Sequence, residues 1–169
     1  MQTLPRLLAS LALVGCAAAP RQAPLAPTPP MGWNSWDSYG TTVTEAQVKA
    51  NADAMARELA PYGWRYVTVD IQWYQPTARG HDYEPGARLA TDSVGRLVPA
   101  PNKFPSAANG AGFRPLADYV HAKGLKFGIH IMRGIPRQAV AANAPILGTP
   151  YHARDVADTT NGCRWNPDM

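Results

Sequence analysis

The clearest strand of the sequence is Tyr66-Val67-Thr68-Val69-Asp70-Ile71-Gln72-Trp73. Its β-branched and aromatic residues are typical of a strand, and its apolar character predicts that this strand is buried. Asp70 is the exception, because a carboxylate is seldom placed in such a segment without a polar partner or a function. We therefore predict a buried strand over residues 66–73 and take Asp70 as a candidate functional residue.

A helix is predicted before this strand. Thr44-Glu45-Ala46-Gln47 has the pattern of a capping box, in which the Thr hydroxyl and the Gln side chain satisfy free N–H groups. The apolar residues that follow recur at helical spacing and are expected to line one buried face: Val48, Ala52, Met55 and Leu59. Pro61 and Gly63 are expected to end this helix.

Two further strands and two further helices are expected. Residues 31–36 predict a short first strand that runs into a loop, and residues 126–131 predict a third strand. A helix that contains Leu116 and Val120 is expected to end at Lys123-Gly124, and residues 136–142 are expected to begin another. We expect loops over 74–112 and 143–169.

Alternation of strand and helix predicts an α/β fold with parallel strands, either an open doubly wound sheet or a (β/α)₈ barrel. No glycine-rich phosphate motif follows any strand, which disfavours a dinucleotide-binding sheet. Polar and aromatic residues instead follow each strand, as in a barrel active site. They are Asn34 and Trp36, Asp70 and Trp73, and His130 and Arg133. The strand ends therefore favour a barrel, and the open sheet remains the alternative from the residues alone.

Composition narrows the function classes. The chain has 169 residues, 46% of them hydrophobic and 17% charged, which suits one folded domain with a core. The net charge is +4 and the basic residues are scattered singly, so nucleic acid is not an expected partner. The four histidines are widely spaced and no H-E-x-x-H or C-x-x-C occurs, so no metal or cofactor is expected.

The first thirty residues predict a targeting segment that is followed by a spacer. Residues 1–15 contain Arg6 and a short apolar run, as in a secretory signal, and Leu13-Val14-Gly15-Cys16 resembles a bacterial lipobox. Lipidation of Cys16 would anchor an exported protein to a membrane. The alternative is ordinary cleavage after residues 17–19, which yields a secreted protein. The proline-rich residues 16–30 are expected to be an extended tether.

The strand ends suggest a sugar site. The C–H face of a pyranose stacks on an indole and its hydroxyls require charged or amide partners, which Trp33, Trp36, Trp73 and Asp70 supply. Other interpretations remain open from the residues alone. The tryptophans suit a core, Asp70 suits a helix cap or an arginine partner, and His130 suits a hydrogen-bonded core position.

Three ordered motifs resemble glycoside hydrolase family 27, the α-galactosidases or melibiases. The first is Pro29-Pro30-Met31-Gly32-Trp33-Asn34-Ser35-Trp36, and the second is Gly95-Arg96-Leu97-Val98-Pro99 with Phe104-Pro105. The third is Leu116-Ala117-Asp118-Tyr119-Val120-His121-Ala122-Lys123-Gly124-Leu125-Lys126-Phe127-Gly128-Ile129. The resemblance spans about residues 28–131. It implies an α/β fold in which residues 31–169 form about three βα units, the N-terminal part of a glycosidase (β/α)₈ TIM barrel. It also implies retaining hydrolysis of a terminal α-linked galactose or a related sugar.

The resemblance also implies site residues. Trp36 matches a tryptophan that lines the sugar pocket, and Asp70 matches the first of two consecutive aspartates that hold galactose hydroxyls. Ile71 stands where the second aspartate is expected, and His130 stands where the third strand usually carries Tyr. We expect Trp36, Asp70, Trp73 and His130 to bind substrate. Both departures lie in the expected pocket and argue against standard galactose specificity, which leaves another α-linked sugar or an arabinopyranosyl-type sugar open.

A retaining glycosidase needs two carboxylates roughly 5–5.5 Å apart. In the resembled family they lie on strands four and six, so we expect both beyond residue 169 and an inactive chain without them. Asp155, Asp158 and Asp168 follow no strand, whereas Trp165 is a further candidate stacking face. The alternative to an enzyme is a non-catalytic, lipid-anchored sugar-binding protein or a degenerate family member.

Overall fold

The structure, a computed structural model, describes residues 28–169. The expected signal segment, Cys16 and most of the expected tether lie outside the described residues. Within residues 28–169, no helix combines the length and the apolar character that crossing a bilayer demands.

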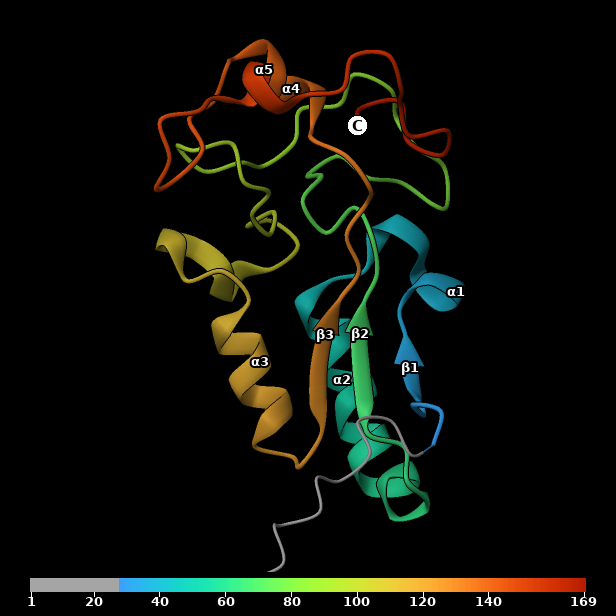
Figure 1. Cartoon of the computed structure of the whole chain (residues 1–169). Helices are drawn as coiled ribbons and strands as arrows, with labels where there is room; N and C mark the ends of the chain where they lie inside the picture. The colour runs from blue at the N-terminus through green and yellow to red at the C-terminus, as the bar shows by residue number, and fades with distance from the viewer. Residues whose placement is uncertain (1–27) are drawn as a thin grey trace, which may run out of the picture.

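Three parallel strands form one sheet in the order β1-β2-β3. They are β1 (Gly32–Asn34), β2 (Tyr66–Val69) and β3 (Lys126–Ile129). The central strand pairs Val67 with Trp33 on one side and with Phe127 on the other. The strands run in the same direction, and the loops that follow them gather beyond their carboxyl ends (Figure 1). The prediction of three parallel strands in an α/β fold is confirmed.

The strands end earlier than the sequence predicted, because side chains capture the backbone groups at their carboxyl ends. The backbone N–H of Asp70 donates to Ser35 Oγ, and that of Ile71 donates to Asp70 Oδ1. After β1, the backbone N–H of Trp36 donates to Asn34 Oδ1. The ladder therefore stops at Val69, and residues 71–74 form a turn where the sequence predicted the end of the strand.

The helix before β2 begins with the capping box that the sequence predicted at Thr44 and Gln47. It comprises α2 (Glu45–Ala54), a π-helical turn η2 (Met55–Leu59) and a 3₁₀ turn η3 (Ala60–Tyr62). The π turn winds its residues more widely than an α-helix and rotates the apolar face. Leu59 is consequently 41% exposed, so its predicted place in the core is wrong.

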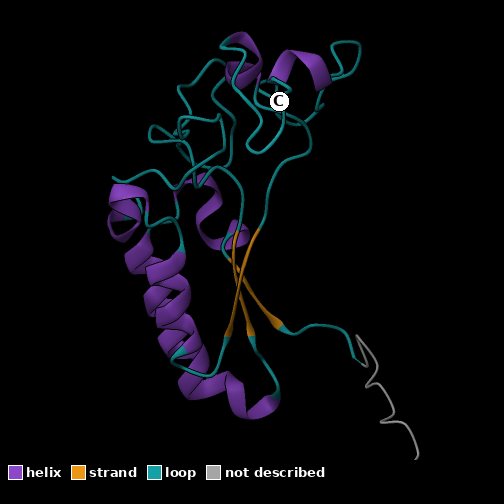
Figure 2. Ribbon diagram, turned by 60° about the vertical axis from the view of Figure 1, so that its left-hand side comes forward, coloured by secondary structure: helices purple, strands orange, loops and turns teal. Residues whose placement is uncertain are grey.

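One face of the sheet is covered by α2 and by α3 (Arg114–His121), while the opposite face has no helix among the described residues (Figure 2). The core lies between the sheet and these two helices. It is built from apolar residues that are almost fully buried, among them Val48, Ala52, Val67, Val69, Leu116 and Val120.

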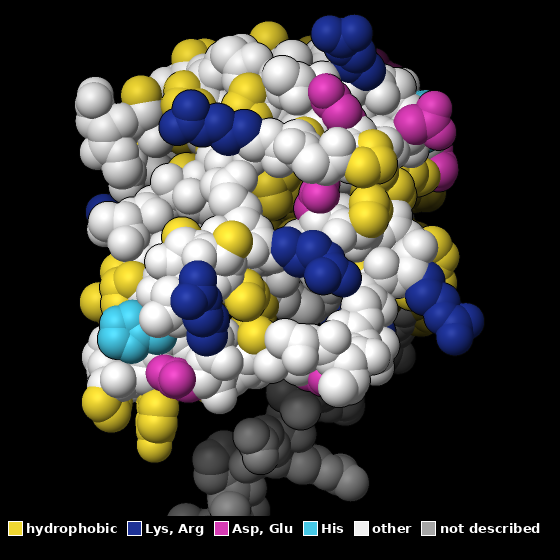
Figure 3. Space-filling model, turned by 90° about the horizontal axis from the view of Figure 1, so that it is seen from above, with side chains coloured by type: hydrophobic (Ala, Val, Ile, Leu, Met, Phe, Trp, Pro, Cys, Tyr) yellow, Lys and Arg dark blue, Asp and Glu magenta, His cyan; other side chains and the backbone are white. Residues whose placement is uncertain are grey.

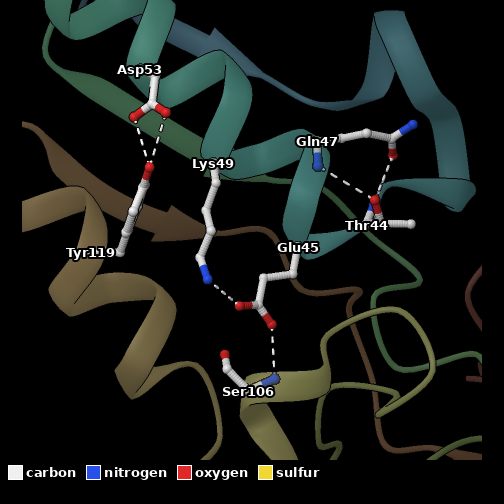
Figure 4. Close-up of polar contacts among 7 residues, drawn as sticks. All are labelled: Thr44, Glu45, Gln47, Lys49, Asp53, Ser106 and Tyr119. Carbon is white, nitrogen blue, oxygen red and sulfur yellow. Dashed lines mark hydrogen bonds and ion pairs between the residues drawn. The ribbon is translucent and has the colours of Figure 1, made fainter.

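Polar contacts join α2 to its neighbours (Figure 4). Tyr119 of α3 donates its hydroxyl to both carboxylate oxygens of Asp53, at 2.8 and 2.9 Å. Glu45 accepts from Lys49 and from the backbone N–H of Ser106. Burial alone would raise the pKa of Glu45, but the hydrogen bonds from Lys49 and Ser106 outweigh it, and the pKa is lowered. These contacts join α2 to α3 and to the segment around Ser106.

Loops and short helices form a second layer beyond the carboxyl ends of the strands. In chain order, its short helices are α1 (Trp36–Tyr39), η1 (Gly40–Thr42), η4 (Pro105–Gly110) and α4 (Arg137–Ala141). A further short helix, α5 (Ala153–Val156), lies where the sequence predicted only loop. Its capping box pairs His152 with Asp155. Histidine is not one of the residues preferred at the N-cap, so the sequence did not predict the start of this helix.

Candidate functional site

A pocket of about 680 Å³ opens beyond the carboxyl ends of the strands. It is lined after β1 by Asn34, Trp36 and Asp37, after β2 by Asp70 and Ile71, and after β3 by His130, Ile131, Met132 and Arg133. Loop residues Tyr83, Cys163 and Trp165 complete the lining. Figure 3 looks down on this face, where the Lys and Arg side chains lie apart from one another and form no continuous basic surface.

Asp70 is the polar centre of the pocket and receives contacts from all three strand ends. Its Oδ2 accepts from Asn34 Nδ2 at 2.7 Å, and its Oδ1 accepts from the backbone N–H of Ile71 at 2.6 Å. His130 Nδ1 lies 3.0 Å from the same Oδ1. A carboxylate offers about four lone-pair positions, so these contacts leave Oδ2 with one for a ligand hydroxyl. Asp70 is 6% exposed and therefore rigidly held.

His130 faces Asp70 with one ring nitrogen while just over half of its side chain remains open to solvent. Its backbone carbonyl accepts a 2.9 Å hydrogen bond from the indole of Trp73, and its backbone N–H donates to Val69. The imidazole is therefore placed at the pocket wall by contacts on both sides of its backbone. It can present a donor or an acceptor to a ligand hydroxyl.

Trp36 is held in the pocket wall at the start of α1. Its backbone N–H donates to Asn34 Oδ1, and its backbone carbonyl oxygen lies 3.1 Å from His81 Nε2. Its ring meets the His81 ring edge to face, with centroids 5.5 Å apart. An indole fixed in this way offers a flat apolar surface to the C–H face of a sugar.

Trp73 is not among the residues that line the pocket, and its contact with substrate stays a prediction. It is 3% exposed and packs edge to face against Tyr74 and Phe113, at centroid distances of 5.0 and 5.1 Å. The turn that follows Asp70 ends the alternation of the strand and directs this indole into the core. Trp73 supports the site from behind, through its bond to the His130 carbonyl. Trp33 likewise packs against the core.

Ile71 lines the pocket beside Asp70 and is 4% exposed. It brings an alkyl surface to the place where hydroxyl groups of a sugar would be held. Sequence reasoning missed other lining residues, among them Asp37, Tyr83 and Met132. Tyr83 comes from the long segment 74–112, whose lack of periodicity gave no means of placing it.

Lys103 is a buried cation behind the pocket that sequence reasoning also missed. Its Nζ donates to the carbonyls of Thr41 and Gln72, at 2.6 and 2.8 Å. Burial lowers the pKa of this amine to about 8. Gln72 has a φ of +63°, a left-handed conformation that a non-glycine residue adopts at some cost. Lys103 thus ties the turn after β2 to η1, and α1 with Trp36 leads directly into η1.

The three aspartates of the last segment serve local structure. Asp155 caps α5, and Asp158 accepts from Thr160. Asp168 accepts from the backbone N–H of Gly86 at 2.9 Å. None of them is among the residues that line the pocket. Within residues 28–169, no three His, Cys, Asp or Glu side chains gather as a metal ion would require.

Residues 28–142 match the family described as alpha galactosidase A. The chain superposes on a family 27 β-L-arabinopyranosidase from Geobacillus stearothermophilus with a TM-score of 0.84 and 64% identity, over 85% of this chain. It is 38% identical to alpha-galactosidase A of Cellvibrio japonicus over 96% of its length. It is also 42% identical, over 63% of its length, to the alpha-galactosidase of Cyamopsis tetragonoloba.

The chain spans only part of each relative: 33% of the Geobacillus chain, 36% of the Cellvibrio protein and 22% of the Cyamopsis protein. The structural match confirms the predicted fold class, since these glycosidases are barrels and the three parallel strands superpose on one of them. The resemblance seen in the sequence motifs is confirmed as well.

Proposed function

This chain belongs to the alpha galactosidase A family of glycoside hydrolases, and from that premise we propose that the whole protein removes a terminal β-L-arabinopyranosyl group from its substrates in preference to an α-D-galactosyl group. The two sugars share the configuration of their ring carbons. They differ in that the pentose lacks the hydroxymethyl group of galactose.

The buried Ile71 in the pocket wall is the observation that carries this proposal. An isoleucine accepts no hydrogen bond, so a hydroxyl held against it would lose its partner on leaving water. A pentopyranose has one hydroxyl fewer to satisfy and a more apolar edge. The 64% identity to a β-L-arabinopyranosidase supports the same preference.

Asp70, His130 and Trp36 have distinct roles in this proposal. The free lone pair of Asp70 Oδ2 accepts a ring hydroxyl in a charge-assisted bond. His130, which Asp70 orients, binds a second hydroxyl. Trp36 stacks on the C–H face of the ring. Together they fix the sugar in one orientation.

Bond cleavage in this proposal follows the retaining mechanism, which requires a nucleophile and a separate acid/base. Asp70 is unsuited to attack, because its two oxygens already accept three contacts. Asp37 is the only other carboxylate that lines the pocket within residues 28–169. We assign the catalytic pair to strands four and six of the whole barrel and the binding of the sugar to the present residues.

The test is a substrate panel with the whole protein. Aryl β-L-arabinopyranoside, α-D-galactoside, α-N-acetylgalactosaminide and α-D-glucoside are compared by kcat/KM. The arabinopyranoside is expected to be the best substrate. A higher kcat/KM for the galactoside would refute the proposed preference, and absence of turnover with binding retained would favour the sugar-binding alternative.

We also propose that the protein is exported and held on a membrane by a lipid on Cys16. The support is the short apolar run that ends in Gly15-Cys16, followed by a proline-rich tether. Cys16→Ala is expected to move the protein from the membrane fraction to the soluble exported fraction. Unchanged fractionation would contradict the lipid anchor, and retention of the unprocessed chain in the cytoplasm would show that the variant blocks export instead.

A further inference from the structure

Trp165 is the most exposed tryptophan at the pocket, with 73% of its surface open to solvent. It stands in the last loop of the described chain and lines the same pocket as Asp70 and Trp36. An exposed indole on a loop without anchoring contacts would not by itself indicate a binding site, because exposed apolar side chains are common. This one, however, lies on an anchored segment.

Of the four residues after Trp165, Asn166 and Met169 are buried, and Asp168 is tied to other segments of the chain. Asn166 is 1% exposed, and its Oδ1 accepts from the backbone N–H of Asp168. Asp168 in turn accepts from the backbone N–H of Gly86 through its side chain and from that of Arg137 through its carbonyl. The base of the loop is therefore tied to two other segments, at Gly86 and at Arg137, while the indole is exposed among the described residues. The loop presents a rigid apolar surface that no described residue covers.

The depth of the pocket decides what this surface would meet. Asp70 and Ile71 are almost fully buried and form its floor, whereas Trp165 stands at its open rim. A terminal sugar held by the floor has the rest of the glycoside leaving through the rim. Trp165 thus lies where the group attached to the sugar must pass.

We propose that Trp165 is a stacking platform for the leaving group, and that it selects glycosides whose leaving group begins with a flat ring, either a second pyranose or an aryl group. Both rings offer a flat apolar face that suits an indole. This inference rests on the proposed function, because it requires a sugar at the floor of the pocket. The platform adds a second binding position, which contacts the leaving group of the substrate and not its terminal sugar.

Binding of S-linked glycosides, which resist hydrolysis, tests the platform without turnover. Calorimetry on the whole protein compares phenyl and methyl S-glycosides of β-L-arabinopyranose in the wild type, Trp165→Ala and Trp165→Phe. The wild type is expected to bind the phenyl glycoside about 3- to 10-fold more tightly. Trp165→Ala is expected to abolish this difference while it retains the methyl glycoside, and Trp165→Phe is expected to restore part of it. An S-linked disaccharide then shows whether a pyranose ring is accepted as well as an aryl ring.

Trp64→Ala is the matched control, since Trp64 is 37% exposed and lies just before β2, at the end of the sheet away from the pocket. It should leave the preference for phenyl unchanged. Equal affinities of the two glycosides in the wild type, or a preference that survives Trp165→Ala, would overturn the platform and leave the sugar site standing. If the wild type bound neither glycoside, the sugar site would fail, and the platform with it.

Discussion

Asn34 and Asp70 are 36 residues apart in the chain, yet the side-chain amide of the first donates a 2.7 Å hydrogen bond to the carboxylate of the second. Parallel pairing of β1 with β2 brings the two strand ends together, and the residues that follow each strand then meet. Ser35 adds a second link by accepting from the backbone N–H of Asp70. The polar floor of the pocket is therefore a direct product of the strand register.

Asp70→Asn is expected to lower kcat/KM for the best substrate of the whole protein by about 10- to 150-fold. The change removes a hydrogen bond to a charged group, which contributes about 1.5–3 kcal/mol. The new amide also meets the amide of Asn34, so the free energy of unfolding is expected to fall as well. Kinetics measured well below the Tm of both proteins separate the two effects.

Ser35→Ala provides the control for that comparison. It deletes the acceptor of the Asp70 backbone N–H at 2.9 Å but leaves the pocket side chains in place. We expect a lower Tm with kcat/KM changed by less than about threefold. An equal loss of kcat/KM in the two variants would mean that Asp70 acts only through the stability of the turn.

Ile71→Asp is expected to shift the ratio of kcat/KM for arabinopyranoside over galactoside toward galactoside by at least about tenfold. The new carboxylate supplies an acceptor for a hydroxyl that the wild type leaves unpaired, and sites discriminate strongly by such bonds. Ile71→Val keeps an alkyl surface and should preserve the wild-type ratio. A ratio that is the same in all three proteins would remove Ile71 as a determinant of specificity.

The buried amine of Lys103 is expected to make the free energy of unfolding depend on pH. Burial lowers its pKa from 10.5 to about 8, so between these pH values the unfolded chain holds a proton that the folded chain has released. The free energy of unfolding therefore rises with pH across this window, by at most about 3 kcal/mol at about 1.36 kcal/mol per pKa unit. Below about pH 8 both states are protonated and this contribution is constant.

Urea unfolding of the wild type and of Lys103→Met, at several pH values from 7 to 10.5, measures this effect. The difference in free energy of unfolding, wild type minus variant, is expected to increase as the pH rises. Lys126→Met is the control, because Lys126 is an exposed lysine at the start of β3. A difference that stays flat with pH would show that the Lys103 amine does not titrate in this range.

Thr44→Ala is expected to destabilise the protein without affecting catalysis. The variant loses the capping box at the start of α2, shown in Figure 4, which costs about 0.5–2 kcal/mol. Thr44→Ser keeps the hydroxyl and should retain most of the stability. Thermal unfolding measures the first effect, and an unchanged kcat/KM at low temperature confirms the second. A large change in kcat/KM would show that the helical layer is coupled to the pocket.

The sequence allowed the elements with strong local signals to be predicted. The capping box at Thr44 and the strand at Val67–Val69 depend on neighbouring residues, so their local pattern sufficed. Leu59 was misplaced because a π turn rotated the apolar face, and Trp73 packs in the core because the strand ends early; tertiary contacts set both features. Pocket residues such as Asp70 and His130 were found because parallel strands bring their ends together.

Lys103 shows the limit of that reasoning. Nothing in its local sequence indicates that its amine reaches Thr41 and Gln72, residues 62 and 31 positions away. Tyr83 and Cys163 reach the pocket through irregular loops, for which no periodicity exists to be read. Long-range placement of loop residues depends on the packing of the whole layer, so the composition of the pocket required the structure.

The Lys103 anchor binds backbone oxygens of residues 41 and 72 and touches no side chain of the pocket lining through these bonds. These two hydrogen bonds therefore do not depend on which side chain occupies position 71. Under the proposed function, a substitution there is expected to change which sugar the pocket accepts and to leave the support of the turn intact. On this proposal, the preferred sugar depends on position 71 and the support of the turn depends on Lys103. A single replacement at position 71 is therefore expected to change the preferred sugar without any change to the fold around it.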